Sequence, residues 1–252
     1  MKIAFQGIKG AYSELSLLRH FGKDAESLGC ITFEEVFDAV EQGSVDFGYI
    51  PVENTIAGTV VENYDLLLFR EVAIAAEVYT PIRHTLLARK GSDLAAIRKA
   101  YSHPHALSQC RSFLKEHGIE PVLVYDTAGA ARMVSRSRET DCAAIASELC
   151  AEYYDLAILN RNIQSNVSNS TRFFVIARKD RLPDPIPDAA KTSLAFQTRH
   201  YPGALVDCLT IFKRHNLNLT KLESRPIPAE PWKYTFYTDF EGGIQQDDVR
   251  YA

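Results

Sequence analysis

The sequence predicts an α/β protein, and three observations carry that prediction. A short apolar strand, a turn containing glycine or a hydroxyl, and a helical pattern follow one another repeatedly over residues 1–181. The chain has 252 residues with 46% hydrophobic content, which is enough to bury a core and to form more than one domain. A proline-rich stretch at residues 183–187 then precedes a smaller C-terminal region.

Composition and charge exclude several classes of protein. The formal net charge of -4, with both signs interspersed, gives no basic face for nucleic acid. Residues 1–14 contain no apolar export segment and no run long enough to cross a bilayer, so we expect a cytoplasmic protein without a membrane partner. No nucleotide-binding glycine motif and no metal-type cysteine pair occurs, so we expect no cofactor and no metal. We expect buried thiols at Cys30, Cys110, Cys142, Cys150 and Cys208.

The first strand-to-helix unit lies at the N-terminus. A strand at residues 2–5 is followed by Gly7 and Gly10, and a helix is expected to open near residues 11–13. Because glycine has no Cβ, these two positions let the backbone approach a ligand closely.

The second unit contains a helix with clear end signals. Thr32 and Glu35 form a capping box, residues 36–40 give the helix an apolar inner face, and Gly43 ends it. This helix is predicted to be structural.

The next strand, at residues 47–52, delivers polar side chains to its carboxyl end. Glu53, Asn54 and Thr55 follow the strand and precede a helical pattern at residues 60–69. Open α/β sheets bind ligands at this end of their strands, so these residues are candidate ligand contacts.

A second lobe is predicted after a hinge near residues 76–81. Its strands at 100–102, 122–125 and 143–146 are each followed by polar residues and a helical pattern. Pro104 suits the first turn of a helix that runs on through Gln109 and Leu114, and Ser147 is expected to be a helix N-cap. The chain then returns toward the first lobe, so the second lobe is expected to be inserted into the first.

Residues 166–179 are the strongest candidate for the working centre. The polar run at 168–172 stops at an apolar run at 173–177 that has the composition of a buried strand. Thr171 offers a hydroxyl, and Arg172 offers a planar cation that suits carboxylates. Two lobes with helix starts facing a cleft would favour an anionic ligand. The same residues also fit a polar loop that leads into a strand, and both interpretations stay open from this segment alone.

Six segments in order, FQGIKGAYS, PVENT, SHPHALSQC, DTAGAA, AAIAS and STRFFV, resemble the prephenate dehydratase family, and the resemblance runs over nearly the whole chain. It implies two α/β lobes like those of periplasmic solute-binding proteins, with the active site in the cleft between them. The implied domains are a dehydratase domain at 1–181 (lobe one about 1–78 and 168–181, lobe two about 79–167), a linker at 182–190 and an ACT regulatory domain at 191–252.

The resemblance implies a lyase reaction without a cofactor or a metal. Prephenate, a cyclohexadienol with two carboxylates, loses CO2 and hydroxide to give phenylpyruvate. By match to the family motifs, Thr171 lies near the leaving hydroxyl, and we assign it hydrogen-bond donation because a neutral threonine is a poor acid. The implied catalytic residues are Thr171, Asn54, Gln109 and Ser102, and the implied substrate-binding residues are Arg172, Ser13, Thr55, Glu53 and Phe173.

The C-terminal region is predicted to be a small α+β domain in the order βαββα. An ACT domain, which has a ferredoxin-like fold, adds one more strand, so the expected domain is incomplete at its C-terminal end. The segments GALVDCL and ESRPIP resemble the phenylalanine-binding motifs of ACT domains, and they imply L-phenylalanine as effector and a homodimer or homotetramer. The implied effector-binding residues are Gly203, Ala204, Leu205, Val206, Glu223, Ser224, Arg225 and Pro226.

Three alternatives to a prephenate dehydratase are kept. Arogenate dehydratase would act on a substrate that differs only by an amino group on the side chain. A non-catalytic binder of anionic solutes would use the same two lobes, but it would be expected to carry an export signal. A pure amino-acid sensor would not need the first-domain motifs together.

Overall fold

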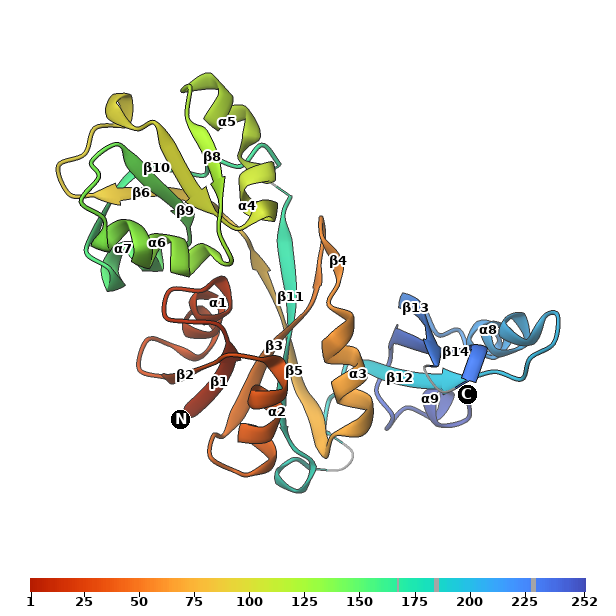
Figure 1. Ribbon diagram of the computed structural model, residues 1–252. Coiled ribbons are helices and arrows are strands. Elements are labelled where there is room, and N and C mark those ends of the chain that lie inside the picture. Colours follow the sequence, from red (N-terminus) through yellow and green to blue (C-terminus); the bar gives the residue numbers. More distant parts are fainter. Residues whose placement is uncertain (167, 184–185, 228–229) are drawn as a thin grey trace. The chain divides into compact units, whose positions relative to one another are not determined.

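The structure is a computed structural model that describes residues 1–166, 168–183, 186–227 and 230–252 (Figure 1). The chain forms two compact units, Met1–Lys179 and Asp180–Ala252. Four residues of the expected motifs and linker, Val167, Asp184, Pro185 and Pro228, lie outside the described residues.

Lobe one of the first unit is a mixed sheet covered by helices. Its strand order is β2-β1-β3-β11-β5, with the short β4 paired to β3. Strand β1 runs parallel to β2 and β3, whereas β11 runs antiparallel to β3 and β5. Its elements are β1 (Lys2–Gln6), α1 (Tyr12–Phe21), β2 (Glu26–Cys30), α2 (Phe33–Glu41), β3 (Phe47–Asn54), β4 (Gly58–Thr59), α3 (Val61–Phe69), β5 (Val72–Pro81) and β11 (Ser170–Arg178).

Helix α2 forms where its end signals predict it. Thr32 Oγ1 accepts a hydrogen bond from Glu35 N, and the Glu35 carboxylate accepts one from Ile31 N. The apolar face buries Val36, Phe37, Ala39 and Val40 against the sheet. The predicted cap and inner face are confirmed, although the carboxylate reaches one residue beyond the cap.

Lobe two is built on a second mixed sheet in the order β10-β6-β9-β7-β8. Its central strand β9 is completely buried and consists of small residues and one isoleucine, so helices can pack closely on both faces. Its elements are β6 (Thr85–Arg89), the 3-10 turn η1 (Leu94–Ala96), β7 (Lys99–Ser102), α4 (Pro104–Gln109), α5 (Arg111–Glu116), β8 (Glu120–Leu123), α6 (Thr127–Arg136), β9 (Cys142–Ala146), α7 (Leu149–Tyr153) and β10 (Leu156–Arg161).

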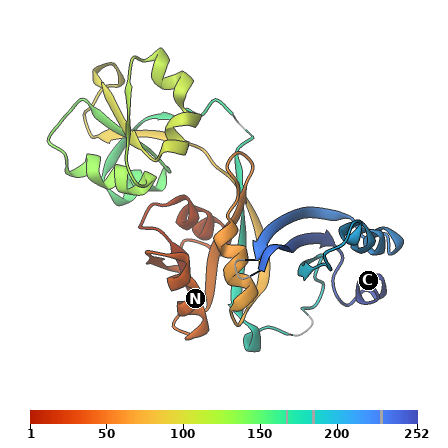
Figure 2. The ribbon, with the colours of Figure 1, turned by 45° about the vertical axis from the view of Figure 1, so that its right-hand side comes forward.

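The two lobes are connected by the neighbouring strands β5 and β11 (Figure 2). The chain leaves lobe one after β5 and returns to it at β11, and the pairing continues where Ile82 N donates to the Asn169 carbonyl. Residues just outside these strand ends are therefore placed where the lobes meet.

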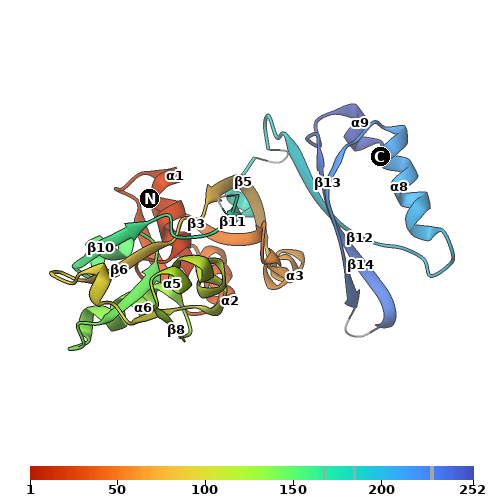
Figure 3. The ribbon, with the colours of Figure 1, turned by 90° about the horizontal axis from the view of Figure 1, so that it is seen from above.

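The second unit follows the predicted βαββα order. Strands β12 (Lys191–Gln197), β14 (Glu230–Glu241) and β13 (Leu219–Ile227) form an antiparallel sheet in that order, and the 3-10 turn η2 (Lys179–Arg181) spans its boundary with the first unit. Helices α8 (Ala204–Arg214) and α9 (Asp247–Arg250) lie along one face of the sheet (Figure 3). A small hydrophobic core lies between these helices and the sheet and contains Phe212, Leu217, Phe240 and Val249.

Three local predictions were wrong. Ser147 does not cap α7, because its hydroxyl instead donates to the Gly10 carbonyl at 2.6 Å. The helix expected to run from Pro104 through Leu114 is divided at Cys110, which separates α4 from α5. At Gly10 a Cβ would lie 2.5 Å from Cys150 Sγ. The missing Cβ therefore allows α7 of lobe two to pack against this position, whereas the sequence predicted close approach of a ligand.

The cysteines are free thiols, four of them buried and Cys208 half-buried. Within the described ranges, no helix has both the length and the apolar character to cross a membrane.

Candidate active site

The ends of β3 and β11 bring two of the expected catalytic residues together. Thr171 is paired in register with Asn54, and Asn54 Nδ2 donates a hydrogen bond of 2.9 Å to Thr171 Oγ1. Both residues are half-buried. Because the strand pairing fixes the register, the threonine hydroxyl has a defined position.

The amide of Asn54 has a fixed orientation. Its Oδ1 accepts hydrogen bonds from the backbone N–H groups of Ile56 (3.0 Å) and Ala57 (2.9 Å), as in an Asx turn. A backbone N–H can only donate, so Nδ2 must face Thr171. The Thr171 hydroxyl has no other hydrogen-bond partner among the described residues, and its hydrogen is therefore available to a ligand.

Asn169 continues this network into lobe two. Asn54 Nδ2 also donates to Asn169 Oδ1 at 2.8 Å, and Asn169 Nδ2 donates to Gln109 Oε1 at 2.7 Å. Asn169 is only 2% exposed, and Gln109 is the last residue of α4. The three amides thus join expected site residues from both lobes.

His84 and Tyr12 form the other end of the network. His84 Nε2 lies 2.7 Å from Gln109 Oε1, and the Tyr12 hydroxyl lies 2.6 Å from His84 Nδ1. Burial lowers the pKa of His84, and its hydrogen bond with Gln109 opposes that shift only in part. Burial raises the pKa of Tyr12 well above its usual value. Both side chains are consequently neutral near pH 7.

Two expected site residues lie in the cores of the lobes. Ser102 is completely buried, and its hydroxyl donates to the Ile145 carbonyl at 2.6 Å. Phe173 is 1% exposed and stacks on Tyr49, with 4.8 Å between ring centroids. The structure does not bring either residue into the hydrogen-bond network.

Two further expected residues lie beside the network. Thr55 is exposed and joins the loop before β11 to the end of β3, because its hydroxyl donates to the Ser168 carbonyl and accepts from Ser170 N. Ser13 is half-buried next to Tyr12 at the start of α1, and it has no side-chain partner in the described parts of the chain.

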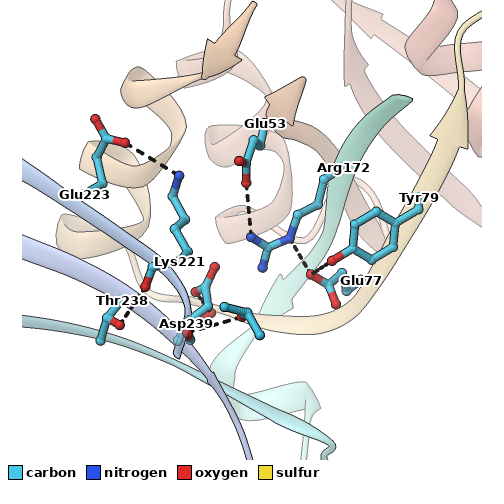
Figure 4. Close-up of polar contacts among 10 residues, drawn as sticks. Glu53, Glu77, Tyr79, Arg172, Lys221, Glu223, Thr238 and Asp239 are labelled. Carbon is cyan, nitrogen blue, oxygen red and sulfur yellow. Dashed lines mark hydrogen bonds and ion pairs between the residues drawn. The ribbon is translucent and has the colours of Figure 1, made fainter. Parts of the chain in front are cut away.

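Arg172 lies in an ion-pair cluster with Glu53 and Glu77 (Figure 4). Its Nη1 is 3.5 Å from Glu53 Oε2, its Nε contacts Glu77 Oε1, and Tyr79 donates a hydrogen bond of 2.9 Å to the same Glu77 oxygen. Its guanidinium also lies 4.8 Å from the ring centre of Phe174. Because side chains alternate along a strand, Arg172 and Thr171 point to opposite faces of β11.

The expected effector-binding residues lie in the second unit. Gly203 is the N-cap of α8 with φ +92°, and residues 204–206 form the first turn of that helix. Residues 223–226 lie in β13, where they pair with β14.

Sequence reasoning missed His84 and did not single out Asn169. The position of His84, between the hinge and the next strand, was the only available signal, because its partners come from α1 and α4. Asn169 stood in the polar run before β11, but nothing in the run separated it from its neighbours.

The fold and the network together define a class of protein. Two α/β lobes, joined by two crossing strands and sharing a neutral polar network where they meet, form a two-lobed protein of the periplasmic-binding-protein type. In the described ranges, no cluster of histidine, cysteine and carboxylate side chains could hold a metal ion.

Within this class the family is shown by sequence. The family model described as prephenate dehydratase matches residues 3–181. The chain belongs to the prephenate dehydratase family.

One protein sequence and two solved structures are similar to this chain. Arogenate dehydratase/prephenate dehydratase 2, chloroplastic, of Arabidopsis thaliana is 38% identical over 261 residues, which cover 100% of this chain and 68% of that protein. A solved structure described as prephenate dehydratase in complex with L-Phe from Arthrobacter aurescens has a TM-score of 0.89 and 29% identity, covering 99% of this chain and 83% of its own. A second solved structure, described as GqqA, a novel type of quorum quenching acylases, has a TM-score of 0.91 and 35% identity. The match covers 99% of this chain and 90% of that chain.

Proposed function

We propose that the chain converts prephenate to phenylpyruvate. In this carbon–oxygen lyase reaction the bond from the ring to its carboxylate breaks and CO2 leaves. The electron pair enters the ring, which becomes aromatic, and the C4 hydroxyl departs with its bonding electrons. The observation that carries the proposal is the Thr171 hydroxyl, which accepts from Asn54 and keeps its hydrogen for a ligand.

Thr171 is placed to stabilise the departing oxygen. A donor that is already oriented costs no reorganisation when negative charge develops, so its contribution is larger in the transition state than in the ground state. Asn54 supports this by orienting Thr171. The amide nitrogen of Gln109, which has no partner in the described parts of the chain, is a second donor toward the substrate.

We assign the substrate carboxylates to donors at the start of α1. Ser13 and the first turn of α1 offer a hydroxyl and N–H groups next to Tyr12, and a helix start favours an anion. Arg172 was expected to counter a carboxylate. Its ion pairs with Glu53 and Glu77, on the face of β11 opposite Thr171, support a role in holding the strand instead.

Product identification tests the proposed reaction. The purified chain is incubated separately with prephenate and with arogenate, and phenylpyruvate and phenylalanine are quantified. We expect phenylpyruvate from prephenate. Phenylalanine from arogenate alone would assign the arogenate dehydratase alternative, and tight binding of prephenate without any product would assign a non-catalytic binder.

The geometry favours dehydration over amide hydrolysis. An acylase needs a nucleophile activated by an adjacent base. Thr171 is instead hydrogen-bonded by an asparagine amide, and both ring nitrogens of His84 are taken up by Tyr12 and Gln109.

We further propose that L-phenylalanine regulates the chain through the second unit. The start of α8 offers N–H groups to the amino acid's carboxylate, and Glu223 in β13 offers a carboxylate to its ammonium group. In this arrangement the pocket forms between two copies of the unit, so binding and association are linked and a homodimer or homotetramer is the expected state.

Gly203→Val is expected to abolish binding of L-phenylalanine. With φ at +92°, a β-branched residue at 203 forces the start of α8 to move. Calorimetric titration, run with sedimentation at matched protein concentrations, measures the effect.

Gly22→Val is the matched control for this experiment. Gly22 ends α1 with φ +93°, and like Gly203 it has open space where a Cβ would lie. If both variants bind L-phenylalanine as the unaltered chain does, or if the unaltered chain shows no binding, the proposed effector site is refuted.

A further inference from the structure

The contact between Tyr12 and His84 joins the two lobes directly. Tyr12 is the first residue of α1 in lobe one, and His84 lies just before β6 in lobe two. Their rings meet edge to face with 5.4 Å between centroids, and His84 is 3% exposed. The backbone of His84 is also fixed, because its N–H donates to Gln164 Oε1 at 2.9 Å.

The direction of every hydrogen bond in the network follows from Asn54. The backbone N–H groups of Ile56 and Ala57 fix Asn54 Oδ1 as their acceptor, so Asn54 Nδ2 donates to Asn169 Oδ1. Asn169 must then present Nδ2 to Gln109, whose Oε1 accepts it. Rotating any one of these amides would bring two donors or two acceptors face to face.

The donor-to-acceptor order of these hydrogen bonds also determines which ring nitrogen of His84 carries the hydrogen. Gln109 Oε1 can only accept, so Nε2 of the imidazole must be protonated. A neutral imidazole then has a bare Nδ1. The single hydrogen of the Tyr12 hydroxyl goes to this nitrogen, at 2.6 Å, in preference to the Arg83 carbonyl, which lies at 3.2 Å. Taking the shorter contact at each donor, the network runs from backbone N–H groups in lobe one to a tyrosine of the same lobe, passing through lobe two. The longer contacts are from Asn54 Nδ2 to the Ser170 carbonyl, at 3.1 Å, and from the Tyr12 hydroxyl to the Arg83 carbonyl.

We infer that His84 and Tyr12 are positioning residues that act through Gln109, holding its carbonyl inward and its amide nitrogen toward the substrate. This inference rests on the proposed dehydratase function. Tyr12 fixes the imidazole ring from lobe one, the imidazole fixes the amide at the end of α4, and the shared network holds Gln109 in register with Thr171. Neither side chain touches the reacting atoms.

A histidine series tests the inference by turnover and rescue. His84→Gln keeps an N–H donor toward Gln109, whereas His84→Leu keeps none. We expect kcat with prephenate to fall about 100-fold in the leucine variant, as for a misplaced catalytic group, and to recover to within about tenfold of wild type in the glutamine variant. An equal loss of kcat in the two variants would show that the N–H donor at position 84 has no effect on turnover, and would overturn the inference.

Two tyrosine variants distinguish a positioning role in the network from a hydrogen bond that only joins the lobes. The Tyr154 hydroxyl also joins the lobes, since it donates to the Lys9 carbonyl at 2.6 Å, but it does not touch the network. We expect Tyr12→Phe to lower kcat about tenfold, in line with one lost hydrogen bond, and Tyr154→Phe to stay within about twofold of wild type. The reverse order would overturn the role of Tyr12.

Nitrogen NMR of labelled histidine tests the network without any turnover. The His84 signals are assigned by their absence from His84→Gln, and we expect a neutral ring protonated at Nε2 with Nδ1 accepting a hydrogen bond. A ring protonated at Nδ1 alone would overturn the inference. If wild type converts neither prephenate nor arogenate, the proposed function fails, and this measurement still decides whether the network exists.

Discussion

Thr171→Val is expected to lower turnover of prephenate about 10²–10³-fold, because valine keeps the shape of threonine and removes the oriented donor. The effect should appear mainly in kcat, since a donor that acts on developing charge contributes little to ground-state binding. Steady-state kinetics of the purified variant measure both parameters. A variant that keeps more than about a tenth of wild-type turnover, a loss of only ~1.4 kcal/mol, would contradict the role given to this hydroxyl.

Thr80→Val is the control for that measurement. Thr80 faces Thr171 across the β5–β11 pair, yet its hydroxyl is buried and hydrogen-bonded to Ser16. Removing it should cost about 1 kcal/mol of stability and leave turnover within a few-fold of wild type.

The elements and part of the site could be predicted because they depend on local pattern. The capping signals of α2 and the polar residues at the end of β3 are readable from neighbours in sequence. The structure brings Asn54 and Thr171 together because their strands pair. His84 depends on partners more than 20 positions away, and no local period marks it.

Two of the three failed local predictions, those for Ser147 and Gly10, share a physical cause, which is competition from a tertiary partner. Ser147 has the right chemistry for a helix cap, but the Gly10 carbonyl of the other lobe takes its hydroxyl. Gly10 has no Cβ because Cys150 occupies that space. The substrate-binding role of Arg172 stays a prediction. Because residues 170–178 form one strand, side-chain alternation puts Arg172 and Thr171 on opposite faces of β11.

Arg172→Met is expected to destabilise lobe one by about 3–5 kcal/mol, the usual cost of removing one partner from a buried ion pair. The Arg172 side chain is 8% exposed and that of Glu77 is 19% exposed, so Glu77 would lose its contact with the Arg172 guanidinium in a largely buried place. Glu53, at 40% exposed, is better solvated and contributes less. Hydrogen exchange of the β11 amides under increasing urea measures the local free energy of opening.

Arg172→Lys then separates strand-holding from a substrate contact. Lysine keeps the charge but cannot reach two carboxylates on the flanking strands β3 and β5 with one planar fork. If Arg172 holds the strands, the lysine variant should lose protection of the β11 amides while the KM for prephenate changes less than about threefold. If it binds a substrate carboxylate, KM should rise more than about tenfold with protection unchanged, because a lost charged hydrogen bond costs about 1.5–3 kcal/mol of binding. In the double variant Arg172→Met/Glu77→Leu, stability should recover toward wild type, because both charges of the buried pair are then removed together.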